Sequence, residues 1–112
     1  MKRTLFLLVL IISISTVMGQ KQANHWYFGE YAGLNFSSGT PVAQTNGALS
    51  TMEGCSSIST DNGALRFYTD GISVWNRDHV IMPNGFGLKG DPSSTQSGII
   101  VPKPASDNLY YI

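Results

Sequence analysis

Glycine or proline interrupts nearly every ten-residue window after residue 20. No segment in this region repeats apolar residues at the three- and four-residue spacing of an amphipathic helix. Short runs rich in aromatic and β-branched residues lie between the interruptions, and turn-forming residues bound each run. The pattern predicts an all-β fold built from short antiparallel strands and hairpins.

The predicted strands are 25–29, 33–36, 41–45, 56–60, 64–70, 72–77, 79–82, 98–104 and 109–112. Within 64–70, one set of alternate residues is less polar than the other. The first set is Leu65, Phe67 and Thr69, and the second is Arg66, Tyr68 and Asp70. Successive strand residues point to opposite faces of a sheet. The alternation therefore predicts that this strand has one buried face and one solvated face.

Two segments, 56–69 and 99–112, share one layout: a strand, a turn rich in Asp and Asn, and then Leu followed by aromatic residues. Repeated hairpins of this kind are typical of a β-propeller or a β-sandwich. A propeller blade takes about 40–45 residues. We therefore expect residues 20–112 to be the first two or so blades of an incomplete β-propeller, truncated at the C-terminus inside an apolar strand.

Residues 1–19 have the layout of a signal peptide. Lys2 and Arg3 precede an apolar run over 5–14, and Val17 and Gly19 place small residues before a cut at Gln20. The run is shorter than the ~20 residues needed to span a bilayer as a helix. We predict a cleaved N-terminal signal helix, with a membrane anchor as the alternative. The protein is then expected to be exported, without membrane insertion after cleavage.

Charge and cysteine content limit the partners and the redox chemistry. Only 12% of the residues are charged, and loss of Lys2 and Arg3 with the signal peptide leaves the rest slightly acidic. Binding to nucleic acid requires a basic face, so this class of partner is not expected. The single cysteine, Cys55, allows no intramolecular disulfide and is predicted to be a small buried apolar residue.

The glycines Gly85, Gly87 and Gly90 have the G-x-G-x-x-G spacing of a dinucleotide-binding turn. That turn needs a helix directly after the glycines, whose N-terminus binds the pyrophosphate. Here Pro92 and a run of small polar residues follow instead. We expect 83–98 to be a connection between strands, with Gly87 and Gly90 at positive φ and no bound cofactor. Two further glycines, Gly63 and Gly71, are predicted to serve turns.

The sequence offers few candidates for chemistry. His25 and His79 are the only histidines and lack the spacing of a zinc site, so no metal and no catalytic residue is predicted. Trp26 and Trp75 could stack on a sugar ring, although such aromatics commonly belong to a core. Turn residues such as Asp61 are expected to stabilise turns through hydrogen bonds rather than to bind calcium.

The strings "WYFGEYAGLNF", "FYTDGISVWNRDHVIMPNG" and "GDPSSTQSGIIVPKP" carry a resemblance. Over residues 24–112 the chain resembles the N-terminal propeller-like region of large secreted proteins of the Bacteroidetes. Many of these continue into PKD-type domains and end in a gliding-motility-associated or type IX secretion sorting domain. The resemblance implies an extracellular protein or one exposed at the outer-membrane surface. Its N-terminal region would be a non-catalytic module for adhesion, binding or assembly, and the resemblance names no site residues.

The partners expected from this resemblance are an extracellular protein or glycan and the remainder of the protein's own longer chain. The alternative is the N-terminal part of a secreted hydrolase acting on polysaccharide or protein. Glu30 and Glu53 could be imagined as an acid–base pair, and Ser94 or Ser97 could be imagined in a Ser-His-Asp triad. No motif in the sequence favours either arrangement.

Overall fold

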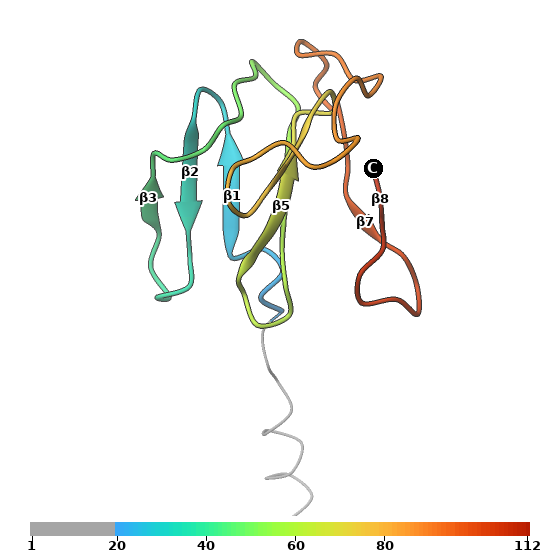
Figure 1. Cartoon of the computed structure of the whole chain (residues 1–112). Coiled ribbons are helices and arrows are strands. Elements are labelled where there is room, and N and C mark those ends of the chain that lie inside the picture. Colours follow the sequence, from blue (N-terminus) through green and yellow to red (C-terminus); the bar gives the residue numbers. More distant parts are fainter. Residues whose placement is uncertain (1–19) are drawn as a thin grey trace, which may run out of the picture.

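A computed structural model of the chain describes residues 20–112 (Figure 1). The predicted signal peptide, 1–19, lies outside the described residues. Over the described part of the chain, no helix is long and apolar enough to cross a membrane.

The described residues form eight short strands in three antiparallel sheets. Each sheet is a run of consecutive strands, so the prediction of an all-β fold of short antiparallel strands and hairpins is confirmed. Sheet 1 holds β1 (His25–Phe28), β2 (Ala32–Asn35) and β3 (Val42–Gln44); sheet 2 holds β4 (Ser56–Ser59), β5 (Leu65–Thr69) and β6 (Val74–Asn76); sheet 3 holds β7 (Val101–Pro102) and β8 (Tyr110–Tyr111).

Eight of the nine predicted strands are present; β2 is as long as predicted but begins one residue earlier, and the other seven are shorter than their sequence patterns. The prediction of a ninth strand over 79–82 is wrong. In this segment Ile81 forms one isolated bridge, to Trp75. The reason is a tight turn before it. The Asn76 side chain accepts hydrogen bonds from the N–H groups of Asp78 and Val80, and His79 has a φ of +62°. After this turn the chain runs back along β6, where the Val80 carbonyl accepts the Asn76 N–H and the Met82 N–H donates to the Val74 carbonyl, but only one isolated bridge forms instead of a strand.

Sheet 2 is covered on both faces, so the prediction of one solvated face on β5 is also wrong. Tyr68 and Thr69 are adjacent in β5, and both are 0% exposed. A register shift lies in the β4–β5 pairing between Ile58 and Ser59. Because the shift skips Arg66, Leu65 packs in the same cluster as Tyr68, while Phe67 packs in the cluster on the opposite face.

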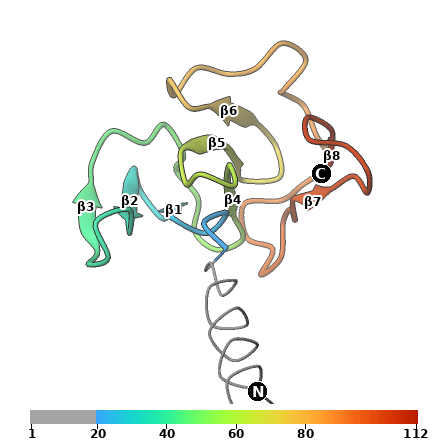
Figure 2. The same cartoon turned by 90° about the horizontal axis from the view of Figure 1, so that it is seen from below.

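Two hydrophobic clusters join the three sheets. The first lies between sheets 1 and 2, and the second lies between sheets 2 and 3. The first contains Tyr27, Leu49, Leu65 and Tyr68, and the second contains Ile58, Phe67 and Val74 with Ile100 and Tyr110 against them. Figure 2 shows the sheets fanning out, with β1 beside β4 and with β3 and β6 at the outside. Sheet 2 is thus the middle layer of a stack of three.

The glycine-rich connection 83–98 joins β6 to β7 without a helix. Gly87 has a φ of +71°, as expected, but Gly90 does not lie at positive φ. Gly90 instead serves a close approach, because a Cβ atom there would collide with the Gly71 carbonyl and the Ser97 hydroxyl. The Ser97 hydroxyl accepts a hydrogen bond from the N–H of Asp91 at 3.0 Å. Gly90 thus allows this connection to pack tightly against the β5–β6 turn.

Two turn glycines lie at positive φ. Gly63 has a φ of +91° in the β4–β5 turn, where its N–H donates to the Thr60 carbonyl. Gly71 has a φ of +85° between β5 and β6, and its N–H donates to the Thr69 hydroxyl. Both angles fall in the left-handed region, where glycine carries no Cβ penalty.

Candidate binding surfaces

Three aromatic rings form a column between sheets 1 and 2. The rings of Tyr27 and Tyr68 stack with centroids 4.5 Å apart, and those of Tyr68 and Trp75 stack at 5.6 Å. Tyr68 and Trp75 are partners across the β5–β6 ladder, which places them on one face of sheet 2. Burial of these rings in an inter-sheet cluster makes this column part of the core.

A polar network caps this column at its solvent side. The Tyr27 hydroxyl donates to the Asn46 side-chain oxygen at 3.2 Å, and the Asn46 amide nitrogen lies 2.9 Å from Nε2 of His79. Nδ1 of His79 lies 3.0 Å from the Tyr68 hydroxyl, which also accepts the N–H of Ala48. With the amide nitrogen donating to Nε2, the ring proton of His79 is on Nδ1 and is donated to the Tyr68 oxygen.

The two tyrosines of this network are poor acids. Burial raises the pKa of Tyr27, and a negative charge on Tyr68 would raise it further, whereas the hydrogen bond to Asn46 opposes the shift. Burial also raises the pKa of Tyr68, against the opposing hydrogen bond from Ala48. Both phenols therefore stay protonated at neutral pH and act as hydrogen-bonding groups of the inter-sheet contact.

Trp26 and Trp75, the two predicted stacking residues, lie on different surfaces. Trp75 packs half-buried against the core cluster, with one ring face on Tyr68. Trp26 is 50% exposed and is fixed by its ring N–H, which donates to the Ala23 carbonyl at 2.8 Å. Its ring also contacts Phe36 at a centroid distance of 5.0 Å. Only Trp26 offers a held and accessible aromatic surface.

Trp26 belongs to an apolar surface that we call the outer face of sheet 1. Trp26 pairs with Leu34, and Leu34 pairs with Ala43 on the next strand, so the three side chains share one face. Strand alternation adds further apolar residues to the same face. The outer face of sheet 1 comprises Trp26, Phe28, Ala32, Leu34, Phe36 and Ala43. Every member of this face is apolar.

The structure brings together a Ser–His pair that the sequence did not indicate. Nδ1 of His25 lies 3.2 Å from the hydroxyl of Ser59, across the contact of β1 with β4. Burial lowers the pKa of His25, and a hydrogen bond with the Gly63 backbone partly opposes this shift. Ser59 is only 1% exposed, so its hydroxyl has no route to a substrate. The pair joins sheet 1 to sheet 2.

The other predicted candidates have structural roles. Cys55 is half-buried against the first cluster, and burial, followed by the nearby charge of Asp70, raises the pKa of its thiol. Ser94 accepts the N–H of Gly54 through its backbone carbonyl. Glu53 accepts a hydrogen bond from the Thr95 hydroxyl at 3.2 Å.

His25 makes hydrogen bonds with Ser59 and with the Gly63 backbone, and His79 makes hydrogen bonds with Asn46 and Tyr68. Within residues 20–112, no group of three or more His, Cys, Asp and Glu side chains could hold a metal ion.

Comparison of the chain with models of protein families, with curated proteins and with solved structures finds no significant match. The resemblance to secreted propeller-like regions therefore stays a prediction from the sequence.

Sequence reasoning missed Asn46 and the long-range role of His79. The local sequence predicts no distant partner for a histidine beside a strand, yet His79 contacts Asn46, which lies 33 positions earlier in the chain, and Tyr68, which lies 11 positions earlier. The one available signal was the Asn46-Gly47 pair, which reads as an ordinary turn. Which side chain a turn places beside a distant histidine depends on how the sheets stack, and this is not encoded locally.

Proposed function

We propose that the chain is a non-catalytic module of an exported protein that binds a protein or glycan at the cell surface and serves adhesion or assembly. The observation that supports this most is the outer face of sheet 1. An apolar face that carries an exposed, fixed tryptophan is typical of an interaction site. The Trp26 ring is already held by Ala23 and Phe36, so little conformational freedom is lost when a ligand packs on it.

The stacking of the sheets supports a propeller-like architecture within this proposal. Each sheet is a run of consecutive antiparallel strands, and sheet 2 is covered on both faces by its neighbours. Blades of a propeller are related in this way. In a propeller-like domain, further sheets of the same protein would cover part of the apolar surface, and the exposed remainder would bind the external ligand.

Fluorescence of Trp26 tests the proposal directly. In a Trp75→Phe background, Trp26 is the only tryptophan, and we expect a blue shift and saturable quenching when the cognate surface glycan or protein is added from an array. Trp26→Ser should abolish retention on that ligand. Met52→Ser, at a side chain 79% exposed outside the outer face of sheet 1, is the matched control and should leave it intact.

Two results would contradict the proposal. One is unchanged retention after Trp26→Ser. The other is a hydrolytic activity towards the array polymers that co-purifies with the protein and survives Trp26→Ser, which would favour the secreted hydrolase instead.

A further inference from the structure

Asparagine followed directly by glycine occurs three times in the sequence, at Asn46, Asn62 and Asn84. In such a pair the backbone nitrogen of the glycine can attack the side-chain carbonyl carbon of the asparagine, because glycine has no side chain to hinder the approach. The attack closes a succinimide ring and releases ammonia. Water then opens the ring and leaves aspartate or isoaspartate. The surroundings of each amide decide how readily it reacts.

The amide oxygen of Asn46 has a fixed proton donor. The Tyr27 hydroxyl donates to Oδ1 of Asn46 at 3.2 Å. This oxygen becomes negatively charged when the carbonyl carbon is attacked, and a donor already held at that position stabilises the charge. Burial raises the pKa of Tyr27, so the hydroxyl keeps its proton at neutral pH. Tyr27 is therefore suited to stabilise the tetrahedral intermediate of ring closure.

The amide nitrogen of Asn46 contacts a histidine. Nε2 of His79 lies 2.9 Å from this nitrogen, and the contact of Nδ1 with the Tyr68 hydroxyl fixes the ring. The attacked amide becomes an amine with a free lone pair, and it departs as ammonia only after it has been protonated. Histidine exchanges protons near neutral pH, so a proton on Nε2 can be passed to the departing nitrogen. His79 is therefore placed to act as the acid.

The backbone nitrogen of Gly47 is less constrained than those of the other two pairs. The Gly63 N–H donates to the Thr60 carbonyl and the Gly85 N–H to the Met82 carbonyl, both at 2.8 Å. The nitrogen must lose its proton to attack, and a hydrogen bond made by the protonated form opposes that loss. Among the backbone hydrogen bonds within residues 20–112, none uses the Gly47 N–H.

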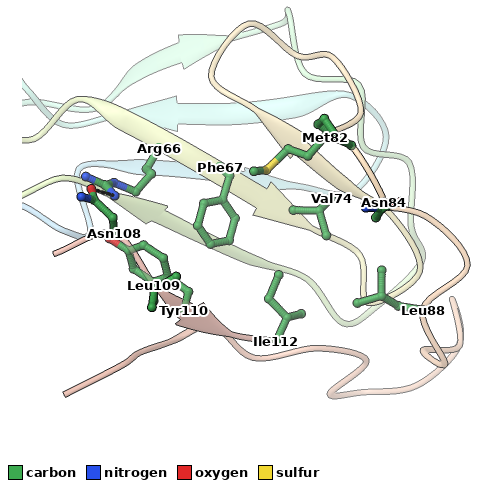
Figure 3. A pocket seen from close by; sticks show the side chains of 12 residues that line it. Arg66, Phe67, Val74, Met82, Asn84, Leu88, Asn108, Leu109, Tyr110 and Ile112 are labelled. Carbon is green, nitrogen blue, oxygen red and sulfur yellow. Dashed lines mark hydrogen bonds between the residues drawn. The ribbon is translucent and has the colours of Figure 1, made fainter. Parts of the chain in front are cut away.

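The other two amides lack this combination of contacts. Asn62 accepts a hydrogen bond from the Thr60 hydroxyl at its oxygen, but the nitrogen of the following glycine is already bonded. Asn84 lines an apolar groove between sheets 2 and 3 together with Val74 and Leu88 (Figure 3). These apolar side chains can neither donate to the amide oxygen nor protonate the nitrogen.

We propose that Asn46 and Gly47 form a self-modification site, at which the Gly47 nitrogen attacks Cγ of Asn46 and ammonia leaves. Tyr27 stabilises the charged oxygen, and His79 protonates the departing nitrogen. One C–N bond forms to Gly47 as the C–N bond of the amide breaks, the Gly47 proton passes to solvent, and hydrolysis of the ring consumes one water. Asn46 is exposed, so water reaches the ring.

The polar network accommodates an aspartate at position 46. A carboxylate cannot donate to Nε2 of His79, but the ring can donate to the carboxylate from Nε2 and accept the Tyr68 proton at Nδ1. The contacts at both ring nitrogens are then retained with their direction reversed. This reaction goes beyond the proposed ligand binding and does not depend on it.

Mass spectrometry measures the conversion at all three asparagines in one sample. The purified protein is incubated in heavy-oxygen water at neutral pH and digested in ordinary water, so only conversion before digestion carries the label. We expect conversion at Asn46 to be about tenfold faster than at Asn62 and Asn84 in the folded protein. In urea the three rates should converge, because the contacts with Tyr27 and His79 are lost.

Two variants remove the assisting groups one at a time. Tyr27→Phe preserves the ring of the aromatic column, and His79→Asn places a residue that tolerates the φ of +62° at this position. Each variant should slow conversion at Asn46 several-fold and leave the other two asparagines unchanged. Those two rates also report folding, because an unfolded variant would convert faster at both.

Three results would overturn the proposal. Conversion at Asn46 that is no faster than at the other two sites of the folded protein would show that its hydrogen bonds protect the amide. A preference for Asn46 that persists in urea would mean that the local sequence explains it. An unchanged Asn46 rate in both folded variants would exclude Tyr27 and His79 from the reaction.

Discussion

Tyr68 is a fully buried member of the cluster between sheets 1 and 2. Its ring stacks on Tyr27 on one side and on Trp75 on the other. Its hydroxyl accepts the Ala48 N–H at 2.9 Å and contacts Nδ1 of His79. The side chain is 0% exposed, so no water can replace these bonds at the hydroxyl.

We expect Tyr68→Phe to reduce the free energy of unfolding by about 1–3 kcal/mol, because the Ala48 N–H and the His79 ring lose a buried partner. Tyr111→Phe removes a hydroxyl from a side chain that is 58% exposed and should change stability by less than about 0.5 kcal/mol. Urea denaturation followed by tyrosine fluorescence measures both changes. Equal effects of the two substitutions would contradict the polar network.

His25 gives stability a pH dependence of defined sign. Burial lowers the pKa of His25 in the folded protein, so the unfolded chain binds a proton at a higher pH than the folded chain does. Stability is therefore fully present above the unfolded pKa of about 6.5 and falls as the pH drops through that value. Thermal melts between neutral pH and mildly acidic pH should show this loss. His25→Gln should flatten the curve, and an unchanged slope would contradict the assignment.

The strands are the elements that local sequence predicts well. Runs such as 25–29, 33–36 and 56–60 combine aromatic or β-branched residues with flanking turn residues, and strands form at each of them. The prediction fails where a side chain acts over a few residues, as Asn76 does when it bends the chain before 79–82. It fails again at β5, because the shift at Arg66 and the covering of both faces depend on neighbouring sheets.

The connection 83–98 depends on its contact with the β5–β6 turn. A Cβ atom on Gly71 would collide with the hydroxyl and the carbonyl of Ser97, and Gly71 also has a φ of +85°. We expect Gly71→Ala to detach this connection and to increase its cleavage in limited proteolysis several-fold. Gly87→Ala is the matched control, because Gly87 has a φ of +71° but open space around its Cβ position. Similar proteolysis of both variants would mean that backbone strain alone explains the effect.

On the scale of the whole molecule, both outer layers of the stack present apolar side chains. The outer face of sheet 1 carries Trp26, and the outside of sheet 3 carries Val101 and Tyr111, which are partners across β7 and β8. Exposed apolar sheet faces and open edges favour association.

We expect sedimentation velocity to show self-association of the protein that increases with concentration, together with a broad thermal transition. Trp26→Ser combined with Tyr111→Ser should shift the distribution toward monomer, whereas Met52→Ser should not. A monomer with one sharp two-state transition at all concentrations would favour a self-contained β-sandwich.

The stacking places sheet 2 in the middle of three layers. Amide hydrogen exchange, followed residue by residue at low protein concentration, tests it most directly. The amides of β5 that bond to β4 and β6 should exchange most slowly, and those of β2 and β3 should exchange faster. Exchange from β5 that is as fast as exchange from β3 would contradict the stacking.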